Sequence, residues 1–160
     1  MSLFKGKYGE QKVVLHLLDK GYTVYTPIID TGIDFVVEPP TDKHKYIGLQ
    51  VRTSSYQKEN DWWTWSIYRD KWRKGSSFYY VLVFEDIDKL PKEVRSKADK
   101  GMVAFIIPYR TLDQMLVKRS KRWVKKDDYT LSINRQSFET GLSKWLKALI
   151  PYLNKWSLLK

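Results

Sequence analysis

The sequence TGIDFVV at residues 31–37, followed by IGLQVRTS at residues 47–54, predicts two neighbouring β-strands and decides the fold assignment. Side chains alternate between the two faces of a strand. Asp34 therefore projects from the first strand, and Gln50 and Arg52 share one face of the second. The two strands are expected to bring a carboxylate, an amide oxygen and a guanidinium together.

An amphipathic helix is expected upstream, over residues 5–20. At about 100° per residue, measured from Glu10, three apolar residues fall on the same stripe: Val13, Val14 and Leu17. Three others are predicted on the opposite side: Lys12, His16 and Asp19. Glu10 thus points toward whatever the helix packs on, where a carboxylate needs a partner or a metal ion.

The rest of the chain reads as strands alternating with short helices. Strands are predicted over residues 22–27, 33–38, 46–53, 61–66, 78–84, 102–107 and 129–133, and short helices over residues 68–74 and 112–117. A final helix carries Leu142, Trp145, Leu146, Leu149 and Leu153, with Pro151 expected to kink or break it. Residues 85–100 read as a surface excursion. Trp63 and Trp65 alternate onto one face with Ile67, which favours core or a dimer interface over base stacking.

This order predicts an α/β fold, a central mixed β-sheet flanked by helices (αβββαβ) with a C-terminal helix. At 160 residues the chain is most simply one domain spanning 1–160. Its core is expected over about residues 5–107, with a strand and helix extension over about 108–160.

Charge and composition restrict the partners. The formal charge is +11, which favours nucleic acid and, less strongly, an anionic membrane surface. Cysteine is absent and only two histidines are present, which excludes thiolate zinc sites and disfavours histidine-rich metal sites. No apolar run reaches the roughly 18 residues of a membrane span, and the first residues do not resemble a signal peptide. An intracellular, cytoplasmic protein is expected, associated with the nucleoid if the source is prokaryotic.

Three short motifs occur in order: Gly9-Glu10, Gly32-Ile33-Asp34 and Gln50-Val51-Arg52. Together they resemble the PD-(D/E)XK, restriction-endonuclease-like nuclease superfamily, over residues 5 to about 84. The pattern is most similar to branches in which Gln replaces the second acid (Q-V-K), including small homing-endonuclease-like and archaeal or bacterial nuclease-like proteins.

That resemblance implies a catalytic set of Glu10, Asp34, Gln50 and Arg52. It also implies that Mg²⁺, or alternatively Mn²⁺, is held by Asp34, the Gln50 side-chain oxygen, the Val51 carbonyl and Glu10. Hard oxygen ligands suit Mg²⁺, which keeps several of its waters and so needs few protein ligands. Gln in place of an acid predicts weaker metal binding that depends more on the substrate phosphate.

Arg52 departs from the family motif, which has Lys at this position. Arginine keeps its proton at any ordinary pH, so it cannot act as a general base. It can still clamp a phosphate with two hydrogen bonds. Lys45 or Lys58 are candidates for a displaced amine. Alternatively, Gln50 and Arg52 are the solvent face of an edge strand.

The nucleic-acid interface is expected to combine the end of the second strand with two basic segments. Its predicted members are Arg52, Thr53, Ser54, Arg69, Lys71, Arg73, Lys74, Lys118, Arg119, Lys121, Arg122, Lys125 and Lys126.

A metal-dependent DNA endonuclease, acting on duplex or branched DNA as a homodimer or higher homo-oligomer, is the leading hypothesis. The first alternative is a nuclease-fold DNA-binding protein whose catalysis is impaired by Arg52. A second is an RNA-binding or RNA-processing protein, because basic charge and aromatic residues also suit RNA.

Overall fold

The computed structural model describes residues 3–29, 32–68, 77–119, 128–141 and 143–160. The strands in these segments are β1 (Thr23–Tyr25), β2 (Phe35–Glu38), β3 (Ile47–Ser54), β4 (Trp62–Tyr68), β5 (Phe78–Phe84), β6 (Val103–Pro108) and β7 (Asp128–Asn134). The helices are α1 (Leu3–Asp19), α2 (Lys92–Arg95), α3 (Tyr109–Arg119), α5 (Arg135–Thr140) and α6 (Lys144–Leu149). Three 3₁₀ turns are η1 (Ile87–Lys89), η2 (Ile150–Tyr152) and η3 (Trp156–Leu158).

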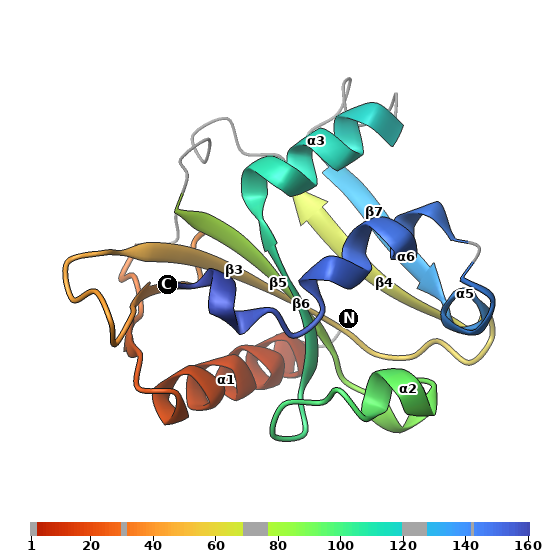
Figure 1. Ribbon diagram of the computed structural model, residues 1–160, viewed down its shortest axis with the longest axis horizontal. Helices are drawn as coiled ribbons and strands as arrows, with labels where there is room; N and C mark the ends of the chain where they lie inside the picture. Colours follow the sequence, from red (N-terminus) through yellow and green to blue (C-terminus); the bar gives the residue numbers. More distant parts are fainter. Residues whose placement is uncertain (1–2, 30–31, 69–76, 120–127, 142) are drawn as a thin grey trace.

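The central sheet has the strand order β1-β2-β3-β5-β6 (Figure 1). All neighbours are antiparallel except β3 and β5, which are parallel. A parallel pair needs a long crossover connection, and here the chain between β3 and β5 includes β4, which pairs with β7 in a separate two-stranded sheet. The predicted mixed α/β architecture is confirmed, and each predicted strand is present with its ends shifted by at most two residues.

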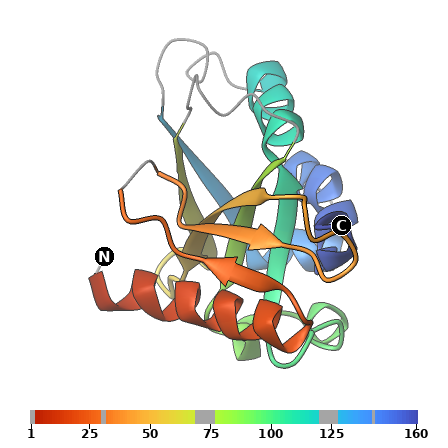
Figure 2. The same cartoon turned by 90° about the vertical axis from the view of Figure 1, so that its left-hand side faces the viewer.

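One face of the sheet is covered by α1, which runs beneath β1, β2 and β3 (Figure 2). Val13 and Leu17 of the helix are fully buried there against Leu49 and Val51 of β3. Gly21, at φ 82°, takes the left-handed conformation that ends a helix and turns the chain into β1. The predicted apolar stripe is therefore the packing face of the helix.

The other face packs against β4, β7, α3 and α6 through an aromatic cluster. Trp63, Trp65 and Ile67 of β4 are buried in it, which confirms that these tryptophans are core residues. Trp65 and Phe84 meet edge to face at 4.9 Å, and the Trp65 indole donates to the Val83 carbonyl at 3.2 Å. Strands β5 and β6 are apolar on both faces because they lie between the two clusters.

The C-terminal part contributes to both clusters and places the chain end beside α1. Leu146 and Leu149 belong to the aromatic cluster, whereas Trp156 and Leu159 pack with the α1 face. The Tyr22 hydroxyl donates to the Leu159 carbonyl at 2.6 Å. The predicted final helix does end before Pro151, which lies in η2.

Two predictions need revision. His16 was expected on the outer side of the first helix, but it is 6% exposed and its ring lies 4.5 Å from that of Trp156. Residues 85–100 are more than a surface excursion, since Leu90 and Val94 belong to the core. Of the predicted helix at 68–74, only Tyr68 lies within the described residues, and it ends β4. Leu142 also lies outside them.

Candidate active site

A gap at the edge of β3 forms the centre of the site. Strand β2 pairs with β3 only from Ile47 to Leu49, whereas pairing with β5 continues to Ser54. On the β2 side, the backbone of Val51 therefore lies beyond the last residue pair between β2 and β3, which is Phe35 with Leu49. The backbone N–H and carbonyl of one strand residue point to the same side. Val51 thus offers a donor and an acceptor to whatever fills the gap.

Asp34 fills part of this gap. Its backbone N–H donates to the Leu49 carbonyl at 2.9 Å, one residue before β2 begins. Its carboxylate Oδ2 accepts the Val51 N–H at 2.7 Å. Both ends of the residue are therefore tied to β3, which fixes the carboxylate beside the Val51 carbonyl.

Glu10 reaches the same place because α1 approaches β3 closely. A Cβ at Gly9 would lie 2.0 Å from Thr53 Oγ1 and 2.9 Å from Thr53 Cβ and Cγ2. No side chain fits there, so glycine is what allows the helix to lie against Thr53. Gly9 is buried and Glu10 is half-buried next to it. Gly9 thus lets α1 approach β3 closely, and this approach places the carboxylate of the next residue, Glu10, at the edge of the strand.

Charges from the three elements act on one another. Burial raises the pKa of Glu10 and the negative charge of Asp34 raises it further, while Arg52 and Lys7 act in the opposite direction. Two carboxylates that repel each other favour a cation between them. Glu10, Asp34 and Arg52 therefore lie close enough for their charges to act on one another; their predicted catalytic role stays a prediction.

The Arg52 guanidinium already contacts this gap. Its Nη1 donates to the Val51 carbonyl at 2.9 Å and lies 3.6 Å from Asp34 Oδ2. The guanidinium carbon is 6.0 Å from the centre of the Tyr68 ring, at the outer range of a cation–π contact. Arg52 and Asp34 are both partly exposed, so the pair is open to solvent and to a ligand.

Gln50 precedes this group on β3 and lies beside Tyr80 of β5 in the strand register. It is 3% exposed, so its amide is buried. Alternation along the strand places its side chain on the face opposite to Val51. Its predicted metal-binding role stays a prediction.

Two cavities open at Glu10. A cavity of about 130 Å³ is lined by Gly6, Glu10, Val51, Arg52, Thr53, Thr64 and Ser66. A wider one of about 530 Å³ is lined by Lys7, Glu10, Gln11, Val14, Leu15, Thr26 and Phe35. Thr64 and Ser66 were not predicted as site residues. The signal was present, because they are the polar positions that alternate with the buried Trp63, Trp65 and Ile67 along β4.

Thr53 and Ser54, predicted to contact phosphate, have packing roles here. Thr53 is buried against Gly9, and the Ser54 hydroxyl accepts the Thr64 N–H at 2.7 Å, which joins β3 to β4. Lys118 is exposed near the end of α3, and Arg119 is its last residue. The other predicted basic contacts lie outside the described residues: Arg69, Lys71, Arg73, Lys74, Lys121, Arg122, Lys125 and Lys126.

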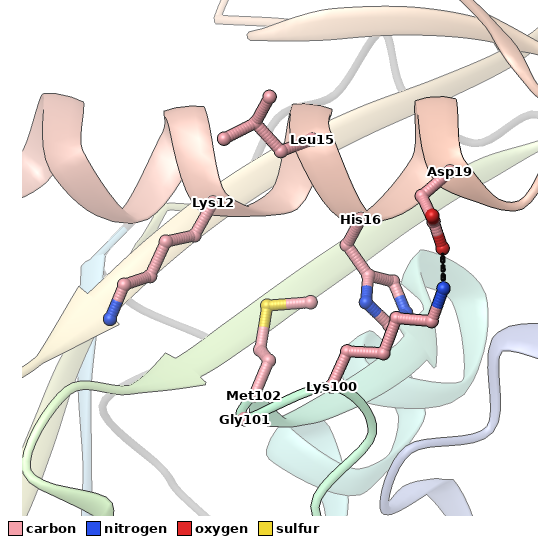
Figure 3. Close-up of a pocket in the computed structure, with 7 residues that line it drawn as sticks. All are labelled: Lys12, Leu15, His16, Asp19, Lys100, Gly101 and Met102. Carbon is pink, nitrogen blue, oxygen red and sulfur yellow. Dashed lines mark hydrogen bonds and ion pairs between the residues drawn. The ribbon is translucent and has the colours of Figure 1, made fainter.

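A separate cavity of about 260 Å³ lies at the other end of α1 (Figure 3). It is lined by Lys12, Leu15, His16, Asp19, Lys100, Gly101 and Met102, and an ion pair joins Lys100 to Asp19 across it. His16 Nε2 lies 3.4 Å from Asp99, which is also paired with Lys20 at 2.8 Å. None of the predicted site residues borders this cavity.

Comparison with known proteins supports the fold. No protein-family model and no curated protein matches the sequence. A solved structure does: it is that of a bacterial homing endonuclease, I-Ssp6803I, with a TM-score of 0.56 and 14% sequence identity. The match covers 99% of this chain and 91% of that one. The likeness thus extends over the whole chain, and the predicted fold class is confirmed.

The described helices include none with the length and apolar content needed to cross a bilayer. Among the described residues, no three His, Cys, Asp or Glu side chains converge as a metal-binding group.

Proposed function

We propose that this protein is a DNA endonuclease that hydrolyses phosphodiester bonds with a divalent metal ion, in the PD-(D/E)XK manner. The observation that carries the proposal is the gap at the β3 edge. It gathers the Asp34 carboxylate, the Val51 carbonyl, the Glu10 carboxylate and the Arg52 guanidinium. The fold likeness to a structure titled as a homing endonuclease adds support.

The residues fit a hard cation. Asp34 Oδ2 and the Val51 carbonyl border the same gap, and both are oxygen ligands of the kind that Mg²⁺ and Mn²⁺ prefer. Glu10 supplies a second carboxylate, whose pKa is raised first by burial and then by the charge of Asp34. When bound, such an ion lowers the pKa of a coordinated water and neutralises charge on the phosphate. We assign Asp34 and Val51 as its principal ligands, with Gln50 as a further candidate.

Three side chains then act on the water, the phosphate and the metal site. The Glu10 carboxylate, facing both cavities, accepts a hydrogen bond from the attacking water and orients it. Arg52 binds the non-bridging oxygens of the scissile phosphate through its planar guanidinium and stabilises the charge that builds there. Asp34, tied to β3 by two hydrogen bonds, keeps the ligands in place without reorganisation.

DNA is the proposed partner because the chain carries a formal charge of +11. Two exposed lysines, Lys7 beside Glu10 and Lys118 on α3, can bind the phosphates of the DNA backbone. A duplex has two strands to cut, so we propose that two copies act together, with one site for each strand.

A second candidate function is a nuclease-fold DNA-binding protein without catalysis. The contacts of Arg52 favour it, because a guanidinium between Asp34 and the Val51 carbonyl supplies a positive charge where catalysis needs a metal ion. Such a protein would bind DNA equally well in the presence of a chelator.

The test is a cleavage panel of supercoiled plasmid, linear duplex and four-way junction, with Mg²⁺, with Mn²⁺ and with EDTA. The endonuclease proposal expects cutting that EDTA abolishes, and a structured RNA as competitor should inhibit less than duplex DNA. Tight, salt-sensitive DNA binding with no cutting under any of these conditions supports the second candidate instead. RNA that competes more strongly than DNA refutes DNA as the preferred partner.

A further inference from the structure

Arg52 occupies a particular position in the site. One nitrogen of its guanidinium, Nη1, is 2.9 Å from the Val51 carbonyl and 3.6 Å from Asp34 Oδ2. The Val51 N–H bond to Asp34 Oδ2 holds those two oxygens on the same side of the β3 edge. A single cationic atom therefore lies between the carbonyl and the carboxylate.

These are the two oxygens that the proposed function assigns to the metal ion. Two cations at one pair of oxygens repel each other, and at such short range the surrounding water screens this repulsion only in part. The guanidinium stays protonated at every ordinary pH, so no change of pH removes this competition. A lysine at this position would lack the fork that spans several acceptors.

A phosphate offers the guanidinium a better partner. Arginine binds phosphate with two parallel hydrogen bonds, whereas here it makes one hydrogen bond to a neutral carbonyl and a longer contact to Asp34. Arg52 also lines the smaller cavity with Thr64 and Ser66, and the centre of the Tyr68 ring lies 6.0 Å from the guanidinium carbon. Movement toward a phosphate would take the guanidinium away from both oxygens.

We propose that Arg52 is a built-in cation that holds the metal subsite of the free protein, so that a divalent ion binds well only when DNA phosphate draws the guanidinium away. The proposal rests on the proposed function and adds regulation to it. Metal and DNA would then bind cooperatively, and because such coupling is reciprocal, each would increase the affinity of the other. This arrangement would limit cleavage to encounters in which both are present.

The experiment measures Mn²⁺ affinity of the full chain by calorimetry or electron paramagnetic resonance, without DNA. Arg52→Met removes the charge but keeps an unbranched side chain, and it should bind Mn²⁺ at least about tenfold more tightly than the wild type. Lys7→Met is the matched control, because the Lys7 charge also acts on Glu10 but Lys7 does not line the smaller cavity that Arg52 and Val51 line. It should change the affinity less than about threefold, as expected for a charge screened by solvent. Circular dichroism checks that both variants fold.

A second arm adds a short unmodified duplex and reads the Mn²⁺ affinity before appreciable cleavage has occurred. The wild type should then gain at least about tenfold in Mn²⁺ affinity, whereas Arg52→Met should gain much less. Equal Mn²⁺ affinities of the wild type and Arg52→Met without DNA overturn the proposal. An equal gain in Mn²⁺ affinity on adding DNA to Lys7→Met and to Arg52→Met overturns it as well. Asp34→Asn in the Arg52→Met background separates the two claims. Unchanged Mn²⁺ binding there refutes the proposed metal site itself, whereas lost binding with no effect of Arg52 refutes only the inference about Arg52.

Discussion

Replacing Gly9 with Ala is the sharpest structural test of the site, because it shifts the helix without removing any charged group. The new Cβ would lie 2.0 Å from Thr53 Oγ1 and 2.9 Å from Thr53 Cβ and Cγ2. Rotating Thr53 exchanges one branch for the other and leaves its Cβ where it is. The helix must therefore retreat from β3 by at least half an ångström, from 2.9 Å to the 3.4 Å at which ordinary contacts begin.

The expected cost follows from this geometry. Overpacking of this kind costs about 1–3 kcal/mol, while Ala in place of Gly stabilises a helix interior by up to about 1 kcal/mol. A net loss of about 1–2 kcal/mol of unfolding free energy is predicted in urea denaturation. Because Glu10 follows Gly9 and moves with it, DNA cleavage should fall roughly 10- to 100-fold.

Gly6→Ala is the matched control, since a Cβ at Gly6 meets nothing within 4 Å on the same helix. It should leave cleavage unchanged and stability equal or higher. Thr53→Ala removes the two branch atoms that the new Cβ would meet. The unfolding free energy of the Gly9→Ala/Thr53→Ala double variant should therefore exceed, by about 1 kcal/mol, the value expected from adding the effects of the two single variants. A Gly9→Ala protein that matches Gly6→Ala in both assays, or a double variant without recovery, would refute the close-approach argument.

Three further predictions concern pH and packing. The raised pKa of Glu10 means that its ionisation opposes folding: the stability it contributes is present below its unfolded pKa and is lost as pH rises through the folded value. Glu10→Gln should therefore stabilise the protein at pH 7 and not near pH 3, as measured by urea denaturation. Burial lowers the pKa of His16, so its contribution is present above the unfolded pKa and is lost as pH falls. His16→Phe, which keeps a ring on Trp156, should reduce the loss of stability between pH 7 and pH 5. Trp65→Ala should cost about 3–5 kcal/mol, because it empties a fully buried site and deletes the indole bond to Val83.

Each of these has an outcome that would contradict it. A stabilisation by Glu10→Gln that is the same at both pH values would mean that charge is not its cause. An unchanged acid profile in His16→Phe would show that another group titrates there. A loss below about 1 kcal/mol in Trp65→Ala would place that side chain outside the core.

The sequence reveals the strands because their patterns depend on local burial. Strands β5 and β6 are continuous apolar runs, and β4 alternates between buried Trp63 and Trp65 and the polar Thr64 and Ser66. Glu10 was predicted to point toward the sheet because three apolar residues share its stripe of the helix. In each case the buried face follows from periodicity within one element.

His16 was placed wrongly because a contact from the far end of the chain decides its environment. Trp156 packs on a second side of α1, and no pattern within residues 5–20 indicates that. The contact of Arg52 with Asp34 and the Val51 carbonyl is equally hidden, since it depends on β2 ending before β3 does. Local patterns predict which residues share a face, whereas strand ends and long-range packing decide which of them touch.

The most direct test of the central claim compares Asp34→Asn with Glu59→Gln in single-turnover cleavage of whichever DNA the panel shows to be cut. The Asn side chain keeps the size of Asp34 and loses the charge, and Glu59 is an exposed acid that lines neither cavity at Glu10. The account predicts a loss of at least about 100-fold in Asp34→Asn, with unchanged folding, and no change in Glu59→Gln. Cleavage by Asp34→Asn within a few-fold of the wild type would contradict it.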